Sequence, residues 1–256
     1  MDKIKVVVLN ESVWSPVGMT GMLAKLTQRG HKVTSAEDLI KLYSDSLKST
    51  SLVDAVVKMC HGSVIRHTPV TIAIIGGSRR LLAQLRTHHV GIDWVSASLQ
   101  YSDYSGSAQF VVPYEILVGP EQHKEAFLKK CKEDLDFYEE IVEKGYSNDT
   151  AGYVMNQALR NVLVATANHE AWLNVINRRV CRRNTTETAY VAALIWKALL
   201  YDTTNGLDMF KYAGPDCLYG KCSEGKFSCG IPFTECDPAK VICNTWPLVK
   251  EEEACS

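Results

Sequence analysis

The chain has 256 residues, and its 28 Lys and Arg nearly balance 29 Asp and Glu, which gives a formal net charge of −1. A chain of this length can bury a large core, and this balance gives no reason to expect nucleic acid or an anionic membrane as a partner. The sequence has no apolar run of the ~20 residues that span a bilayer, and its start is too charged for a signal peptide, so we expect a cytoplasmic protein.

Strands and helices are predicted in alternation along the first third of the chain. The residue patterns predict a strand over 3–10, a turn at Ser15 and Pro16, a helix over 19–28, two helices within 34–60, a buried strand over 70–77 and a helix over 79–86. Ser78 has the side chain of an N-cap for the last of these helices.

A turn-rich segment, residues 84–105, carries many hydrogen-bonding and aromatic side chains. They include His88, His89, Gly91, Trp94, Ser96, Ser98, Tyr101 and Tyr104. Such groups can hydrogen-bond to a planar polar ligand and stack on it, so this segment is the predicted wall of a binding site. A solvated pair of histidines in a polar loop is the alternative interpretation.

The second half of the chain is dominated by helical patterns. An extended run over 110–117 precedes a long amphipathic helix that begins at residue 121, and three helical or mixed elements follow up to residue 200. Arg179 lies in line with an apolar helix face, so it must either reach solvent or meet an anion. The expected fold is α+β, with a mixed sheet from residues 3–10, 70–77 and 110–117 covered by the helices of residues 121–201.

The nine cysteines are an odd number, and five of them crowd into one stretch near the C-terminus: Cys217, Cys222, Cys229, Cys236 and Cys243. In a reducing compartment these, with Cys60, Cys131, Cys181 and Cys255, are expected to be thiols. Their spacing lacks the paired Cys-x2-Cys of a zinc ribbon, so no metal is predicted, and a metal-binding tail is the weaker alternative. An arm that packs on the body or on a neighbouring subunit is favoured.

A second polar group, His61, Ser63 and His67, lies where a helix gives way to the strand over 70–77. Histidines in such a place are more often structural than ligands. The residue types alone therefore leave both a structural and a functional interpretation open.

Four separated segments, in the same order, resemble the flavin-dependent thymidylate synthases over residues 55–230. That family has a Gly-His-x-Ser/Thr-x-x-Glu-His element, a Ser-Arg pair, a signature of Gln-x-x-Arg-His-Arg followed by Ser-x-Arg-Tyr, and later Asn-x-Arg and Glu-Ile-Arg patterns. The matching residues are His61, Ser63, His67, Ser78, Arg79, Gln84, His88, Ser98, Tyr101, Asn168, Trp172, Asn174, Arg179, Cys181 and Glu187. Residues 214–230 are similar to a cysteine-containing tail of some members.

The resemblance implies methylation of dUMP to dTMP with FAD as cofactor, NADPH and methylenetetrahydrofolate as co-substrates, and a homotetramer with active sites between subunits. Carried over position by position, it implies catalytic roles for Arg179 and His61, a nucleotide site of Gln84, Ser98, Gln100 and Arg179, and a flavin site of His61, Ser63, His88, His89, Asn168 and Asn174. The protein would supply positioning and charge rather than a covalent nucleophile.

Most departures from the family pattern fall on its charged positions. Thr87, His89, Gln100, Gly152, Glu170 and Ala189 stand where the family has arginine, and Arg66 stands where it has glutamate. Each charge-assisted contact to a phosphate is worth about 1.5–3 kcal/mol, so the loss of two or three would weaken nucleotide binding by several powers of ten. The available compensating cations are Arg66, Arg86, Arg178, Arg182 and Arg183.

Three hypotheses follow from the matches and the departures together. The chain is a working flavin-dependent thymidylate synthase, a related enzyme that modifies C5 of dUMP or dCMP, for example by hydroxymethylation, or a non-catalytic nucleotide-binding subunit. Flavin content separates the third hypothesis from the others, and nucleotide preference separates the first two. We expect a synthase-like domain over residues 1–213 and a cysteine-rich extension over 214–256.

Overall fold

The protein is described by a computed structural model that covers residues 1, 3–11, 14–48, 50–220 and 222–249. Cys255 of the sequence analysis lies outside these residues. The strands are β1 (Lys5–Glu11), β2 (Pro69–Ser78), β3 (Ile92–Ser96) and β4 (Arg160–Asn168). The α-helices are α1 (Pro16–Arg29), α2 (Ala36–Leu47), α3 (Ser51–Lys58), α4 (Gly62–Ile65), α5 (Arg79–Leu85), α6 (Tyr114–Leu117), α7 (Glu121–Glu143), α8 (Asn148–Ala151), α9 (His169–Arg179), α10 (Thr186–Tyr201), α11 (Gly206–Met209) and α12 (Pro238–Thr245).

The four strands form one sheet in the order β1-β2-β4-β3, and each neighbouring pair is antiparallel. Because side chains alternate between the two faces of a strand, the register separates an inner from an outer face. Ile72, Ile74 and Leu163 lie on the inner face and are buried. The outer face carries exposed Ile75 and Val162, which are paired across β2 and β4.

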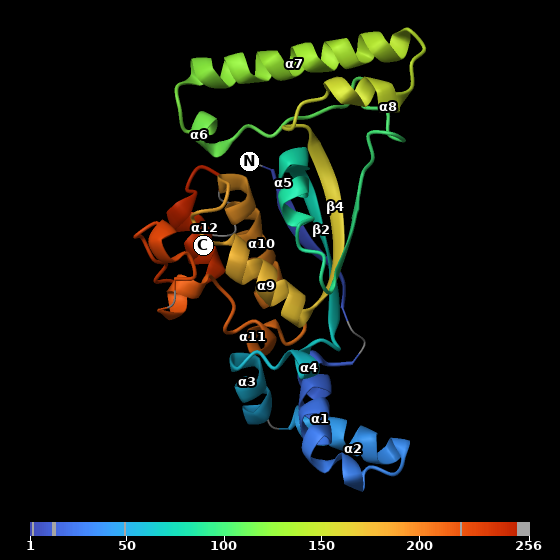
Figure 1. The fold of residues 1–256 in the computed structure, drawn as a ribbon, viewed down its shortest axis with the longest axis vertical. Helices are drawn as coiled ribbons and strands as arrows, with labels where there is room; N and C mark the ends of the chain where they lie inside the picture. Colours follow the sequence, from blue (N-terminus) through green and yellow to red (C-terminus); the bar gives the residue numbers. More distant parts are fainter. Residues whose placement is uncertain (2, 12–13, 49, 221, 250–256) are drawn as a thin grey trace.

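The helices α5, α9 and α10 lie on one side of the sheet (Figure 1). The indole of Trp172 in α9 is fully buried and donates a hydrogen bond to the carbonyl of Val70, at 3.1 Å. Helix α10 is buried on nearly all sides, as its run of alanine, leucine and other apolar residues allows. This packing fixes α9 against the strands and therefore fixes the position of Arg179 at its end.

The long helix α7 lies across one end of the sheet with α8, and the helices α1 to α3 lie at the other end (Figure 1). Over its 23 residues α7 is ~34 Å long, and it buries Cys131 and Tyr138 from its apolar stripe. Tyr138 belongs to a core of its own with Ala151, Met155 and Leu159. The α7 end is therefore a separate packing unit attached to the sheet.

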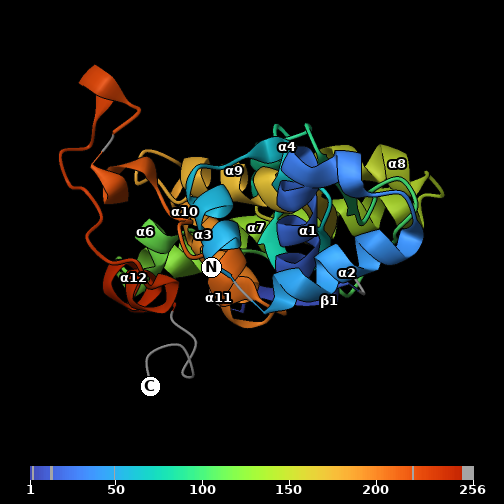
Figure 2. The ribbon, with the colours of Figure 1, turned by 90° about the horizontal axis from the view of Figure 1, so that it is seen from below.

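The residues after α11 extend to one side of the molecule and return to pack α12 against α10 (Figure 2). Val241 and Ile242 of α12 are buried, and the hydroxyl of Tyr190 in α10 donates to the carbonyl of Val249 at 2.7 Å. The final part of the tail thus packs on the body, as the sequence predicted. Within the described residues, no helix is long and apolar enough to cross a membrane.

Several sequence-based expectations about the fold are wrong. The sheet is antiparallel rather than mixed, and residues 110–117 supply only an isolated bridge from Phe110 to Leu159 before they turn into α6. The missing strands are β3, inside the segment expected to be only turns, and β4, where burial alternates along the strand. Helix α7 crosses the end of the sheet instead of covering it (Figure 1).

Seven described cysteines are free thiols, as expected: Cys60, Cys131, Cys181, Cys217, Cys222, Cys229 and Cys236. Cys243 is instead bonded in a disulfide, so the expectation of a thiol is wrong for that residue.

Candidate active site

Arg179, the last residue of α9, connects the two segments that the sequence singled out. Its guanidinium donates from Nε to Nε2 of His88 at 2.8 Å, and from Nη2 to the hydroxyl of Thr87 at 2.6 Å and to the carbonyl of Gln84 at 3.3 Å. Nη1 donates to Oδ1 of Asn184 at 3.0 Å. A guanidinium has five N–H donors, so these contacts occupy four and leave one at Nη1.

The neighbours of Arg179 are themselves fixed. The Thr87 hydroxyl donates to the carbonyl of Gln84 at 2.8 Å, and the amide of Asn184 donates to the carbonyl of Arg178 at 2.8 Å. Burial lowers the pKa of the Arg179 guanidinium, which is surrounded by neutral acceptors rather than by a carboxylate. The arrangement presents a cation whose charge the described contacts do not neutralise.

His88 is held in its neutral form beside this cation. Burial is the main cause that lowers the pKa of His88 to about 4, with the charges of Arg179 and His89 adding to the effect. Since Nε2 accepts the hydrogen bond from Arg179, the neutral ring carries its proton on Nδ1. The indole of Trp94 donates to the carbonyl of His88 at 2.6 Å and fixes the backbone there. His88 therefore offers a donor, not a charge, to a ligand at neutral pH.

A small cavity of about 100 Å³ brings together three predicted flavin residues, His88, His89 and Asn174. Gly91 approaches the fourth, Asn168, so closely that a Cβ at position 91 would lie 3.0 Å from the Asn168 amide nitrogen. Asn168 is the N-cap of α9, where its Oδ1 accepts a hydrogen bond from the backbone of Ala171 at 2.9 Å. The capping role was not predicted, although an Asn before a helix is a recognisable signal.

A second, open cavity of about 350 Å³ contains the predicted nucleotide residues Ser98 and Gln100. Arg79 also lines it, and its Nη1 is buried with no hydrogen-bond partner among the described residues. Two family arginine positions, Gln100 and Gly152, line this same cavity. A Cβ at Gly152 would lie 3.1 Å from the Cβ of Leu99, so the loop has closed over that position. Arg79 was matched to the family but not predicted as a site residue.

His61 and Ser63 lie apart from the Arg179 cluster within one chain. Both are exposed at the start of α4, which packs near the beginning of α9. Arg179 is the last residue of this helix, and eleven residues of α-helix extend over ~15 Å. The structure thus brings Gln84, His88 and Arg179 together, but it leaves His61 and Ser63 at the other end of α9.

Two departures from the family pattern meet at that other end. Arg66, in place of a glutamate, forms a two-pronged ion pair with Glu170, which stands in place of an arginine. Arg66 Nη2 lies 2.9 Å from Oε1 of Glu170, and Arg66 Nε contacts the other carboxylate oxygen. The two replacements are opposite in charge, so together they leave the net charge of the site unchanged.

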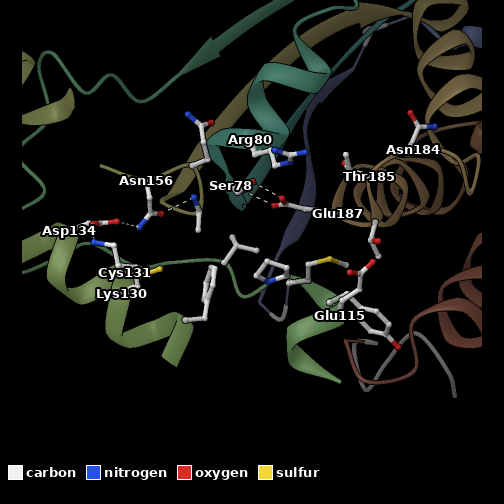
Figure 3. A pocket seen from close by; sticks show the side chains of 18 residues that line it. Ser78, Arg80, Glu115, Lys130, Cys131, Asp134, Asn156, Asn184, Thr185 and Glu187 are labelled. Carbon is white, nitrogen blue, oxygen red and sulfur yellow. Dashed lines mark hydrogen bonds and ion pairs between the residues drawn. The ribbon is translucent and has the colours of Figure 1, made fainter. Parts of the chain in front are cut away.

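A larger cavity of about 650 Å³ lies between the beginnings of α5 and α10 and the helix α7 (Figure 3). Ser78 donates from its backbone to Glu187 at 2.8 Å and from its hydroxyl to the same carboxylate at 2.5 Å. Asn156 donates to Asp134 at 2.9 Å on the opposite wall (Figure 3). None of the predicted site residues lines this cavity.

Solved structures define the class of fold to which the chain belongs. It shares its fold with a UMP/dUMP methylase from Streptomyces cacaoi bound with 5-Br dUMP, at a TM-score of 0.65 and 16% identity over 84% of this chain and 97% of that one. A thymidylate synthase X from Helicobacter pylori with FAD and dUMP gives a TM-score of 0.60 and 14% identity over 82% of this chain and 98% of that one.

The family model of the thymidylate synthase complementing proteins matches residues 20–201, so the chain belongs to that family. It is 28% identical over 182 residues to a flavin-dependent thymidylate synthase of Geobacter sulfurreducens, covering 71% of this chain and 76% of the relative. A flavin-dependent thymidylate synthase of Clostridium tetani is 26% identical over 237 residues, covering 84% of this chain and 89% of the relative. The resemblance noted in the sequence is confirmed.

Proposed function

We propose that this protein is a flavin-dependent thymidylate synthase that transfers a one-carbon unit from methylenetetrahydrofolate to C5 of dUMP, with FAD as cofactor and NADPH as co-substrate. The observation that carries the proposal is the Arg179 cluster, in which a cation lies beside neutral His88 and keeps one N–H that makes no hydrogen bond to the described residues. Both residues fall at matched family positions, and the family match spans them. Bound flavin would supply the redox and one-carbon transfer chemistry.

The residues around the small cavity fit one wall of a flavin site. Neutral His88 and exposed Asn174 and His89 provide hydrogen-bond groups, and Gly91 provides a close backbone approach. Pockets for small molecules usually measure ~300–1,000 Å³, whereas this cavity measures about 100 Å³. The rest of the flavin site would therefore come from a neighbouring subunit, which could carry its own His61 and Ser63.

Arg179 would polarise the pyrimidine base. Its remaining N–H and its charge can stabilise negative charge that develops on a base carbonyl oxygen, which makes C5 more nucleophilic. The contacts to Thr87, His88 and Asn184 hold the guanidinium before substrate binds, so little reorganisation is needed. This is the catalytic role assigned to Arg179.

Arg79 would hold the nucleotide phosphate in the open cavity, beside Ser98 and Gln100. It is the arginine of that cavity, and its Nη1 lacks a partner among the described residues. Phosphate oxygens are suitable acceptors for such a donor. Because Gln100 and Gly152 replace two family arginines there, phosphate binding would depend on Arg79 more than in the family pattern.

One observation favours the second candidate function, modification of C5 in another pyrimidine nucleotide such as dCMP. The neutral replacements at Gln100 and Gly152 line a single cavity, and the closed contact between Gly152 and Leu99 reshapes it. A pocket that recognises a different pyrimidine base would need a changed shape of this kind. Substrate preference is therefore the quantity to measure.

The outer face of the sheet supports a homotetramer. Val95 is 70% exposed and Leu9 is 55% exposed, and Val7, Ile75 and Val162 add to the same apolar surface. Contiguous apolar patches of this kind mark protein interfaces. Light scattering should give a tetramer for the wild type and a smaller species for Val162→Asp. Val118→Asp, which changes an exposed valine away from the sheet, is the matched control, and a wild-type monomer would contradict the proposal.

We also propose that residues 1–213 form the synthase domain and residues 214–256 an extension of it. The family match ends at residue 201, and α12 packs on α10 from outside the sheet. The basis for this division is the end of the family match before residue 214 and the contact of α12 with α10.

The first experiment is a visible spectrum of the purified protein, followed by titration with dUMP, dCMP and deoxyuridine. The synthase predicts bound or readily acquired FAD whose spectrum responds to dUMP, and a response to dCMP alone would support the second candidate. Arg79→Ala should remove most of the preference of dUMP over deoxyuridine, whereas Arg80→Ala, the adjacent residue that lines the other cavity, should not. A protein that binds no FAD would contradict both enzyme proposals.

A further inference from the structure

The tail that follows residue 213 contacts the end of α9 and the connection that leads from α9 to α10. The backbone N–H of Gly214 donates to Oδ1 of Asn177 at 3.3 Å. The guanidinium carbon of Arg182 lies 4.1 Å from the centre of the Phe233 ring, which is a cation–π contact. Phe233 is 6% exposed, so the ring is itself held in the core. The tail therefore contacts the chain on both sides of the last residue of α9.

Asn184 connects this segment to the guanidinium of Arg179. Its side-chain amide donates to the carbonyls of Arg178 at 2.8 Å and Cys181 at 3.2 Å, which uses both of its N–H groups. Its Oδ1 accepts a hydrogen bond from Nη1 of Arg179 at 3.0 Å. The backbone N–H of Asn184 also donates to the carbonyl of Cys181 at 3.0 Å, which closes a tight turn around Arg182. A displacement of Arg182 would therefore displace an acceptor of Arg179.

Asn184 holds a different part of the guanidinium from the other partners of Arg179. The other acceptors, which belong to one short segment of the chain, are the Gln84 carbonyl, the Thr87 hydroxyl and His88 Nε2. They accept from Nε and Nη2, whereas Asn184 is the partner of Nη1 among the described residues. Nη1 also carries the N–H that is left for an oxygen of the base. Asn184 therefore sets the direction in which that N–H points.

We propose that the tail is a positioning element of the active site, in which Phe233 holds Arg182 and Asn184, in the same turn, orients Arg179. This role rests on the catalytic function proposed above for Arg179. A donor that is already oriented needs no reorganisation during the reaction, so loss of the orientation should lower kcat. The family match ends at residue 201, so Phe233 lies outside it. The protein would thus use its extension to hold an arginine of the family pattern.

The first test separates the contact of Arg182 with the tail from a general effect of charge. Arg182→Gln in the full chain should lower kcat for dUMP methylation about three- to tenfold, with KM and FAD affinity within about twofold of the wild type. Arg182→Lys keeps a cation over the ring and should recover part of the loss. Arg183→Gln, which changes the adjacent exposed arginine, is the matched control and should keep the wild-type kcat. Phe233→Leu should resemble Arg182→Gln, and the double variant should lose no more than either single variant.

Asn184→Ala tests the other end of this connection. It removes the acceptor of Arg179 Nη1 and should lower kcat at least about tenfold, again with little change in KM. Thr186→Ala changes a nearby residue at the start of α10 and should keep the wild-type kcat. If the wild type methylates dUMP, an unchanged kcat in both Asn184→Ala and Arg182→Gln would overturn the positioning role and leave the proposed enzyme function intact.

The ring of His88 gives a readout that does not need the reaction. Its Nε2 lies 2.8 Å from Nε of Arg179, so displacement of the guanidinium can only move the charge away from the ring. Because that charge helps to lower the pKa of His88, NMR titration should give a higher pKa in Asn184→Ala and Phe233→Leu. Phe227→Leu, which changes an exposed phenylalanine of the tail, should leave the pKa unchanged. An unchanged pKa of His88 in both test variants would overturn the positioning role, whereas a wild type without FAD or activity would contradict the proposed function.

Discussion

Helix α9 carries one charged side chain in its first turn, Glu170, and another as its last residue, Arg179. Glu170 is paired with exposed Arg66, so the charges of that end cancel. Arg179 is partly buried among neutral acceptors, so its charge remains available. At the first end the family's charges are exchanged between two positions, and at the second the matched arginine is kept while its neighbours change. A lost charge is thus not always a lost interaction.

The largest expected effect comes from Arg179. Arg179→Ala removes the cation and four hydrogen bonds, so kcat/KM for dUMP methylation should fall at least about a hundredfold. Arg179→Lys keeps the charge but loses the planar fork and should give an intermediate loss. Arg178→Ala is the adjacent control, with an expected change within about threefold. A similar loss of kcat/KM in both alanine variants would mean that the end of α9 contributes only its total positive charge, not the specific contacts of Arg179.

Gly91 links the two ends, because it lies between His88 and the N-cap Asn168. Its φ of +73° makes Gly91→Ala strained by about 1–2 kcal/mol, and the new Cβ would press on Asn168 at 3.0 Å. Gly106→Ala has similar strain, at φ +67°, but nothing within 4 Å of its Cβ. Both variants should lower Tm, whereas only Gly91→Ala should weaken FAD binding, by about tenfold. Equal FAD affinity in the two variants would show that Asn168 does not contribute to FAD binding.

The stability of the Arg179 end should depend on pH through its histidine. Burial, with the charges of Arg179 and His89, lowers the pKa of His88 to about 4, and burial also lowers the pKa of His169 to about 4. Below the ordinary value of 6.5 the unfolded chain binds more protons, so this stability is full above pH 6.5 and is lost as pH falls toward 4. Because burial lowers both pKa values, protonation of either histidine lowers the free energy of unfolding.

Measuring Tm of variants between pH 4 and pH 6.5 shows how much His88 contributes to this loss of stability. His88→Gln should reduce the fall in Tm on acidification by a few degrees, and His123→Gln, on the exposed surface of α7, should leave it unchanged. An unchanged dependence of Tm on pH in His88→Gln would show that protonation of buried His88 does not contribute to the loss of stability in acid.

The smallest effect is expected at the exchanged pair. Arg66→Glu and Glu170→Arg each place like charges together and should lower Tm by about 1–3 °C, because the pair is exposed. The double variant restores opposite charges in the family's orientation and should recover most of the loss. Failure of the double variant to recover would mean that the two positions act independently.

Several features could be read from local sequence. Ser78 is a short polar residue directly before a helix, and it accepts the expected backbone hydrogen bond. Asn168 caps α9 in the same way, although this role was not predicted. The apolar stripe of α7 also appears in the structure, with Cys131 and Tyr138 buried. These succeed because helix geometry relates residues only a few positions apart. Strands β3 and β4 were missed because a strand is defined by partners elsewhere in the chain.

The amino-acid patterns alone indicated the family, many of the helices and the Ser78 cap. The assignment of Gln84 and Arg179 to a nucleotide site and of His88 to a flavin site stays a prediction. Which charges meet depends on the tertiary structure. Arg179 contacts a histidine 91 positions away, and Arg66 contacts a glutamate 104 positions away. Such contacts depend on how α9 packs against the sheet and α4, and no local spacing encodes that packing.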